Sequence, residues 1–252
     1  MNLKNILFRL IFVLTFSIAS FPIYCDWDPS ASLKIDKEIV TDALSKPDLV
    51  SLKKKVFDYL VNSWCSKEKA NLIMDLVILK QPMISVEIGI FTGSSLLPIV
   101  AGLSYTNTGY AYAIDPWSSA AAVKGIPRSD GNYAWWSTVS MLDARKVFMT
   151  MINEWDFNSF YTLYYARSNH VDSHFDRIDF LHLDGNFSEE GSYEDVELYL
   201  PKVALGGYIL LSNAFAKVDN EHTKMKSIWL LLDHCEVIAE IENSNTILFQ
   251  KN

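Results

Sequence analysis

Two acidic residues, each in or just after a short apolar run, are well placed in this sequence to bind a ligand. Glu87 lies in the run Ile84–Ile88, which is followed by Gly89 and Gly93. A strand, a glycine turn and a helix start, in this order, form the nucleotide pocket of α/β sheets. Asp115 closes a second apolar run about twenty residues later, where an acid can accept hydrogen bonds from ribose hydroxyls. Together these stretches predict an adenosine-containing ligand at the carboxyl end of a parallel sheet.

The rest of the chain alternates between helical and strand-like patterns, which is typical of an α/β fold. The helices are predicted over Leu49–Trp64, Lys67–Leu79, Ser94–Leu103, Met141–Trp155, Tyr193–Leu200 and Lys224–Leu232. The strands are predicted over Ile84–Ile88, Gly109–Ile114, Phe160–Ala166, Ile178–Leu183 and Tyr208–Leu211, with a closing hairpin over Glu236–Ile241 and Thr246–Gln250. We therefore predict a doubly wound, mostly parallel seven-stranded sheet with one antiparallel strand near its edge. The irregular segment 115–137 is predicted to be a lid or binding loop.

The charge of the chain argues against a polyanionic partner. Its 252 residues carry a formal net charge of -8, whereas proteins that bind a phosphate backbone normally show a basic face. We therefore predict no nucleic-acid partner. The length suits one α/β domain with a sizeable core.

The N-terminus predicts a signal peptide or an N-terminal anchor over residues 1–25. Lys4 and Arg9 precede the apolar run Leu10–Tyr24, which is short for a membrane span, and a buried helix is the alternative interpretation. We expect export, or contact with a membrane only through an uncleaved leader, and a cytoplasmic protein if the leader does not function. A surface linker over 26–48 and one domain over 49–252 complete the predicted organisation.

Three cysteines give no complete disulfide framework, although one pair is possible, and no zinc-binding pattern. Cys65 and Cys235 are expected to be buried apolar residues.

Five stretches in this order resemble the class I S-adenosylmethionine (SAM)-dependent methyltransferases, in the small O-methyltransferase-like branch of the methyltransferase family 24 type. They are VEIGIFTGSS at Val86–Ser95, AIDPWS at Ala113–Ser118, FLHLDGNFSEE at Phe180–Glu190, YEDVELYLPKV at Tyr193–Val203 and GGYILLSN at Gly206–Asn213. The resemblance implies a Rossmann-like methyltransferase fold and SAM as the cofactor.

The resemblance also implies roles for individual residues. Glu87, Gly89 and Gly93 would border the methionine and ribose parts of the cofactor. Asp115 would accept hydrogen bonds from the ribose hydroxyls, and Ser168, after the third strand, would lie near the adenine.

A cofactor contact is also assigned to Trp117 on this basis. Together with Trp135 and Trp136 it would form an aromatic wall or lid. The alternative is that these rings pack onto the core, where aromatic side chains are common.

The implied reaction centre is Asp184, which would face the reacting methyl group or hold a divalent metal. The family pattern commonly has histidine after DGN and a pair of acids ending the fifth strand, but this chain has Phe187 and Ser212-Asn213. A lone carboxylate with the neutral Asn213 would hold Mg²⁺ weakly. His182 shares the face of Asp184 on a strand and is a candidate base, with a buried, hydrogen-bonded histidine as the alternative.

The leading hypothesis is therefore a SAM-dependent methyltransferase that transfers a methyl group to a small hydroxylated acceptor. A catalytically lapsed, exported binding protein is the alternative, because the base and metal positions are altered. An NAD-linked oxidoreductase is disfavoured, because Phe91 stands where the dinucleotide motif needs its middle glycine. The sequence does not predict an oligomeric state.

Overall fold

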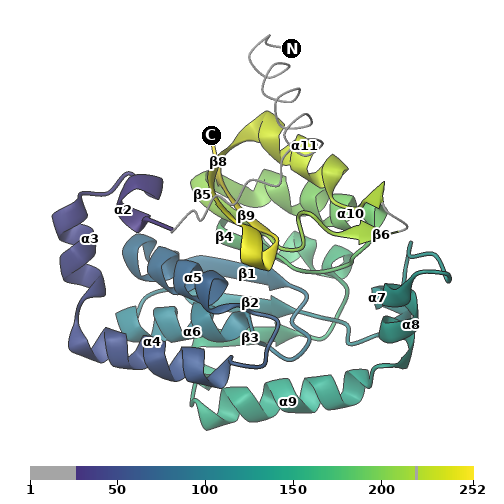
Figure 1. Ribbon diagram of the computed structural model, residues 1–252, viewed down its shortest axis with the longest axis horizontal. Helices are drawn as coiled ribbons and strands as arrows, with labels where there is room; N and C mark the ends of the chain where they lie inside the picture. The colour runs from purple at the N-terminus through teal and green to yellow at the C-terminus, as the bar shows by residue number, and fades with distance from the viewer. Residues whose placement is uncertain (1–26, 219–220) are drawn as a thin grey trace.

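The computed structural model describes residues 27–218 and 221–252. The predicted leader over residues 1–25 lies outside these residues. Within them, one sheet is covered by helices on both faces (Figure 1). No helix of this described part combines the length and the hydropathy that a membrane crossing requires.

The sheet has the predicted seven strands, in the order β3-β2-β1-β4-β5-β9-β8. The strand β9 is antiparallel to both of its neighbours and all other pairs are parallel, which confirms one antiparallel strand next to the edge. The strands are β1 Ile84–Ile88, β2 Tyr110–Ile114, β3 Tyr161–Tyr164, β4 Ile178–Leu183, β5 Val203–Leu211, β8 Cys235–Ile241 and β9 Thr246–Lys251; β6 Lys217–Val218 and β7 Glu221–His222 form a separate ribbon.

The helices pack on two sides of this sheet. One buried cluster includes side chains of α4, α5, α6 and α9, and a second includes side chains of α10 and α11. The α-helices are α2 Pro29–Ser32, α3 Lys37–Leu44, α4 Pro47–Tyr59, α5 Lys67–Lys80, α6 Leu96–Thr106, α7 Ser119–Ala122, α8 Gly131–Thr138, α9 Met141–Glu154, α10 Glu189–Tyr199 and α11 Met225–His234. Short 3₁₀ turns are η1 Asn158–Phe160, η2 Ser168–His170, η3 Asp172–His174, η4 Leu200–Lys202 and η5 Glu242–Ser244.

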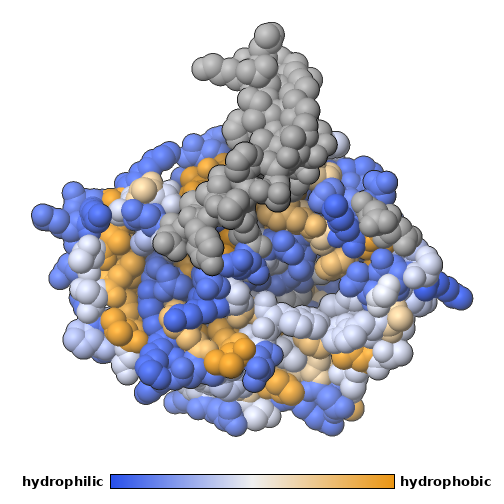
Figure 2. Space-filling model, viewed as in Figure 1, coloured by the Kyte–Doolittle hydropathy of each residue, from blue (hydrophilic) through white to orange (hydrophobic). Residues whose placement is uncertain are grey.

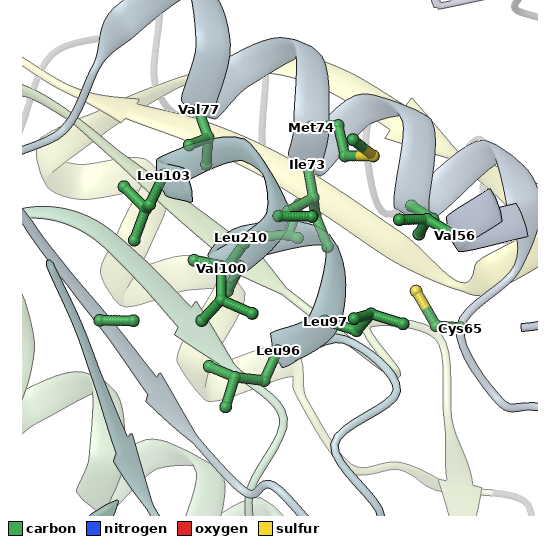
Figure 3. Packing of buried hydrophobic residues seen from close by; sticks show 14 of the residues in the cluster. Val56, Cys65, Ile73, Met74, Val77, Leu96, Leu97, Val100, Leu103 and Leu210 are labelled. Carbon is green, nitrogen blue, oxygen red and sulfur yellow. The ribbon is translucent and has the colours of Figure 1, made fainter. Parts of the chain in front are cut away.

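The packing of α5 against α6 is close because a glycine lies between them. A Cβ atom on Gly102 would come within 2.8 Å of Val77 Cγ1. Figure 3 shows Val77, Leu103 and Val100 in this interface, with Leu210 of the sheet beneath it. Cys65 is buried in the same cluster, as expected, and Cys235 is buried in the other.

Three segments are more regular than their sequences indicated. The segment predicted as a linker contains α2 and α3, whose Leu33 and Val40 are buried. The segment 115–137 contains α7 and most of α8, each capped by its preceding side chain, Ser118 or Asp130. The strand β5 begins at Val203, five residues early, because it continues through a register irregularity around its glycine pair.

The surface in the same view is mixed. Figure 2 shows hydrophilic side chains over most of this face, interrupted by smaller apolar areas. This pattern agrees with a chain that is half apolar and carries a net negative charge.

Candidate functional site

A cavity of about 630 Å³ lies where β1, β2 and β4 end. The turns that follow these strands line it, together with residues of α5, α7, α8 and α10. This is the edge of a doubly wound sheet at which ligands bind. Of the predicted site residues, Gly89, Asp115, Ser168, Asp184 and Asn213 line the cavity, whereas Glu87, Gly93, Trp117 and His182 do not.

The turn after β1 needs both of its glycines. Gly89 has φ +89°, and a Cβ atom there would lie 2.2 Å from the carbonyl oxygen of Asp184. Gly93 has φ +83°, and its Cβ atom would lie 2.6 Å from the ring of Phe148. Only glycine combines this backbone conformation with such close neighbours. The absence of a side chain at Gly89 therefore lets the end of β1 pack against the end of β4, and its absence at Gly93 lets the turn pack against α9.

Asp115 holds this turn in place from the neighbouring strand. Its Oδ2 accepts hydrogen bonds from the backbone N–H groups of Ile90 at 2.8 Å and Phe91 at 2.9 Å, and its Oδ1 from that of Trp117 at 2.6 Å. Burial raises the pKa of Asp115 above its ordinary value, although these three hydrogen bonds act in the opposite direction. A carboxylate offers about four acceptor positions, so one remains for a ligand hydroxyl.

Glu87 and His182 lie beneath the cavity, on the face of the sheet that α5 and α6 cover. The hydroxyl of Ser95 donates to Glu87 Oε1, and His182 Nδ1 lies 3.1 Å from the same oxygen. His182 Nε2 is 2.8 Å from Ser212 Oγ, and its side chain is fully buried. Glu87 Oε2 has no hydrogen-bond partner among the described residues. This arrangement matches the alternative interpretation of His182 as a buried, hydrogen-bonded histidine, because the ring does not reach the cavity.

Asp184 is the carboxylate that faces the cavity at the end of β4. Its Oδ2 accepts a hydrogen bond from Lys69 Nζ at 3.0 Å, and its Oδ1 accepts one from Asn213 Nδ2 at 3.0 Å. Burial would raise the pKa of Asp184, but the Lys69 ammonium holds it below its usual range. Asp184 is therefore ionised at neutral pH.

Lys69 was not predicted from the sequence. Ser66 caps α5, as the sequence indicated, and the third residue of that helix is this lysine. Its side chain is 4% exposed, and it reaches across to donate hydrogen bonds to Asp184 and to Ser212 Oγ at 2.6 Å. The only signal in the sequence was its place beside the helix start, because the pairing joins residues 115 and 143 positions apart.

A second buried acid, Asp195, lies beside Ser168, the residue that the resemblance places near the adenine. Ser168 Oγ donates to Asp195 Oδ1 at 2.5 Å, and both residues line the cavity. Burial raises the pKa of Asp195 to about 6, although the Ser168 hydroxyl acts to lower it. Asp195 lies on α10 and was also missed, because one acid in an amphipathic helix carries no distinguishing pattern.

Four rings, which we call the aromatic wall, also line the cavity. They are Trp64, Phe91, Trp135 and Trp136. Trp64 stacks on Phe91 with ring centroids 5.1 Å apart and planes 8° apart, and the two α8 tryptophans contact both rings. Trp135 and Trp136 thus lie in the predicted wall, and Trp64 was not anticipated.

Trp117 lies in the core beside the wall and does not line the cavity. Its backbone has φ +38°, and its ring packs on Phe148 and donates from Nε1 to the carbonyl oxygen of Phe91 at 2.8 Å. The alternative interpretation, a loop aromatic packed on the core, describes this ring. Its hydrogen bond supports the turn that carries Phe91.

The comparisons with known proteins agree with this architecture. Residues 86–214, slightly more than half of the chain, match the sequence model of a family described as a methyltransferase domain. A comparison with curated proteins gives no match. Among solved structures, the O-methyltransferase TomG of Streptomyces achromogenes, in complex with SAM, is 14% identical with a TM-score of 0.53, over 85% of this chain and 95% of TomG.

Two further structures are similar over most of their lengths. An O-methyltransferase of Bacillus cereus in complex with S-adenosylhomocysteine (SAH) is 13% identical with a TM-score of 0.52, over 85% of this chain and 96% of its own. The SAH-bound methyltransferase PaMTH1 of Podospora anserina is 12% identical with a TM-score of 0.50, over 97% and 94%. At these identities the likeness shows a shared fold. Because the family match runs from the glycine turn through the strand of Asp184 to the end of β5, this chain belongs to the methyltransferase domain family.

Proposed function

We propose that the protein binds SAM and transfers its methyl group to an oxygen of a small hydroxylated acceptor. The observation that carries the proposal is that two chemically different groups of residues line one cavity of about 630 Å³. We call the glycine turn, Asp115 and Ser168 the cofactor part, and Asp184 with the aromatic wall the acceptor part. A lining that combines polar groups with aromatic faces suits a nucleoside cofactor and a second, smaller substrate.

The cofactor part offers the groups that a nucleoside requires. Asp115 keeps one acceptor position for a ribose hydroxyl, and Gly89 lines the same cavity. Ser168 and Asp195 provide further polar atoms in the cavity. The SAM-bound and SAH-bound complexes of the structural neighbours support this assignment.

The acceptor part favours a small, partly apolar molecule. Flat rings pack well against tryptophan and phenylalanine faces, and Asp184 supplies one polar contact at the base of the wall. A hydroxylated acceptor fits both features. The net charge of -8 does not favour a nucleic-acid acceptor.

Methyl transfer requires mainly that the protein positions the acceptor oxygen relative to the methyl group. The cofactor, when bound, supplies a methyl group that its sulfonium already activates. The residues of this chain would align the acceptor oxygen with that methyl group and exclude water from one side, as the aromatic wall is placed to do. The polar groups at Asp184 would hold the acceptor oxygen in line.

The residues around Asp184 do not fit a Mg²⁺ site. Magnesium prefers about six oxygen ligands, but Asn213 directs its amide N–H at Asp184, and both carboxylate oxygens already accept hydrogen bonds. The ammonium of Lys69 adds a positive charge where the metal would lie. Among the described residues, no three His, Cys, Asp or Glu side chains cluster as metal ligands.

The alternative of a catalytically lapsed binding protein is not favoured by the family match or by the cofactor-bound neighbours. Export or membrane anchoring through residues 1–25 stays a prediction. It is compatible with either function, because a leader does not alter the pocket.

The cofactor assignment is tested by calorimetric titration of the full chain with SAH. We expect micromolar affinity, and Asp115→Asn should weaken it by about 10-fold or more, since hydrogen bonds to a charged group contribute about 1.5–3 kcal/mol. Asp143→Asn is the matched control, because Asp143 is exposed on α9 and bonds only to its own helix and cap. Absence of SAH binding by the unaltered chain, or equal losses in both variants, would overturn the assignment.

A further inference from the structure

Lys69 contacts Asp184, the residue for which the resemblance to methyltransferases implied a divalent metal. It is a buried lysine that lines the cavity, and its ammonium lies between the carboxylate of Asp184 and the hydroxyl of Ser212. A buried cation normally needs an oppositely charged partner, because removing a charge from water is costly. Asp184 is this partner, and the position of Lys69 at the cavity suggests that it binds a ligand.

The surrounding groups are arranged for an ammonium. Asp184 Oδ2 and Ser212 Oγ accept from Lys69 Nζ at 3.0 and 2.6 Å, which are hydrogen-bond distances. The amide N–H of Asn213 donates to the other carboxylate oxygen, Oδ1, so each oxygen of Asp184 accepts from an N–H donor. Among the residues that the structure describes, the Asp184 carboxylate thus accepts hydrogen bonds only from N–H groups.

The ammonium keeps a donor for a ligand. An ammonium has three N–H donors, and Lys69 directs two of them at Asp184 and Ser212. The third has no hydrogen-bond partner among the residues that the structure describes. Because Lys69 lines the cavity, a ligand oxygen can take this position.

The lysine is charged at neutral pH. Burial alone would lower the pKa of Lys69, but the nearby Asp184 carboxylate raises it above its ordinary value. Lys69 is therefore a fixed positive charge and not a proton acceptor. A fixed cation next to a bound hydroxyl favours the ionised oxygen, as a metal does in other enzymes.

We propose that the Lys69 ammonium takes the place of a divalent cation and binds the acceptor oxygen as an oxyanion, so that the protein works without a metal. This inference rests on the proposed function. The acceptor hydroxyl loses its proton to water in the open cavity, and the resulting oxyanion is held by the third N–H of Lys69. A lone pair of this oxygen forms the bond to the methyl carbon, the carbon–sulfur bond breaks, and its electron pair stays on sulfur to give neutral SAH.

The test uses a chromogenic phenol, 4-nitrocatechol, as a probe of the oxyanion site. The full chain is saturated with SAH in the presence of EDTA, and the ionisation of the bound probe is followed by its visible absorbance across a pH series. We expect the ionisation constant of the bound probe to rise about tenfold or more over that of the free probe, as for a group within about 4–6 Å of an opposite charge. Addition of excess Mg²⁺ should not alter the value.

Lys69→Met should abolish the shift while the affinity for SAH changes less than threefold. The matched control is Lys53→Met, which removes another largely buried lysine that pairs with an aspartate, Asp75, away from the cavity. This control should keep the shift. If Lys69→Met does not fold, the double variant Lys69→Met with Asp184→Asn removes both members of the pair, and it should bind SAH without shifting the probe.

The outcomes separate the two proposals. A chain that binds no SAH refutes the proposed function and this inference with it. If the chain binds SAH, three results would each overturn the role of Lys69 while leaving the proposed function in place. They are that the probe is not bound as an anion, that the shift in its ionisation requires Mg²⁺, or that the shift survives in the Lys69 variants.

Discussion

At the scale of single residues, the site depends on buried charges that stand in pairs or accept several hydrogen bonds. Lys69 and Asp184 balance each other, and Asp115 is held by three backbone N–H groups. Among the described residues, only the Ser168 hydroxyl donates a hydrogen bond to the Asp195 carboxylate, and burial raises the pKa of Asp195. Such a group makes the folded state sensitive to pH.

The sign of this effect follows from the pKa of Asp195, which rises from 3.8 to about 6 on folding. Between these values the folded chain binds more protons than the unfolded chain, so its free energy of unfolding falls as pH rises. Asp195→Asn removes this dependence. The stability of the variant relative to the unaltered chain should therefore increase by about 2 kcal/mol from pH 4.5 to pH 7.

Urea unfolding of both proteins at the two pH values measures this difference. The comparison cancels the contributions of the other titrating groups, because they are common to the two chains. A relative stability that is independent of pH, or that falls as pH rises, would contradict the burial of an acid at this position.

At the scale of elements, the position of Lys69 depends on how α5 packs. Its helix lies on α6, which begins at the glycine turn, and Gly102 allows the two backbones to approach at Val77 (Figure 3). A change in this helix contact would move the lysine relative to Asp184. The aromatic wall is similarly a product of three elements, because Trp64 follows α4, Phe91 lies in the turn and α8 carries the other rings.

Gly102→Val tests the helix contact. The added side chain would meet Val77 at 2.8 Å or less, and overpacking of this kind costs about 1–3 kcal/mol of stability. Gly131→Ala is the control, since its Cβ atom would meet nothing within 4 Å, and we expect it to be neutral or slightly stabilising. Thermal or denaturant unfolding gives both values, and equal stabilities for the two variants would exclude a tight contact.

At the scale of the whole molecule, the segment predicted as a linker packs against the sheet-bearing part. Leu33 is 4% exposed and belongs to the cluster of α5 and α6, and its carbonyl oxygen accepts a hydrogen bond from Lys80. Lys34 also pairs with Glu236 of β8 at 2.7 Å. Residues near the start of the described chain therefore contribute to the same core as residues near its end.

Leu33→Ala should lower the free energy of unfolding by about 2–3 kcal/mol, because a buried leucine loses its contacts and leaves a cavity. Ile39→Ala, six residues later on α3, is the control, since its side chain is 61% exposed and a surface change is worth less than about 0.5 kcal/mol. Denaturant unfolding of the full chain measures both. If Leu33→Ala is as stable as the control, the segment does not belong to the cooperative core.

The fold was predictable because its signals are local and repeated. Apolar runs of strand length, helical spacing and the two glycines each follow from neighbouring residues, and their order along the chain limits the arrangement of a parallel sheet. The same applies to Gly89, Asp115, Ser168 and Asp184, since the carboxyl ends of parallel strands meet at one edge.

The rest of the site was decided by the tertiary structure. Whether His182 reaches a ligand depends on what covers its face of the sheet, and helices α5 and α6 cover it. Lys69, Trp64 and Asp195 reach the cavity from helices or from a segment beside a helix, and no local pattern tells which of several faces will meet a pocket. The sequence by itself determined the family, the sheet and the edge at which the cavity lies. Only the packing of helices onto that sheet decided which charge stands beside Asp184, because a contact across 115 residues depends on three-dimensional distance and not on spacing along the chain.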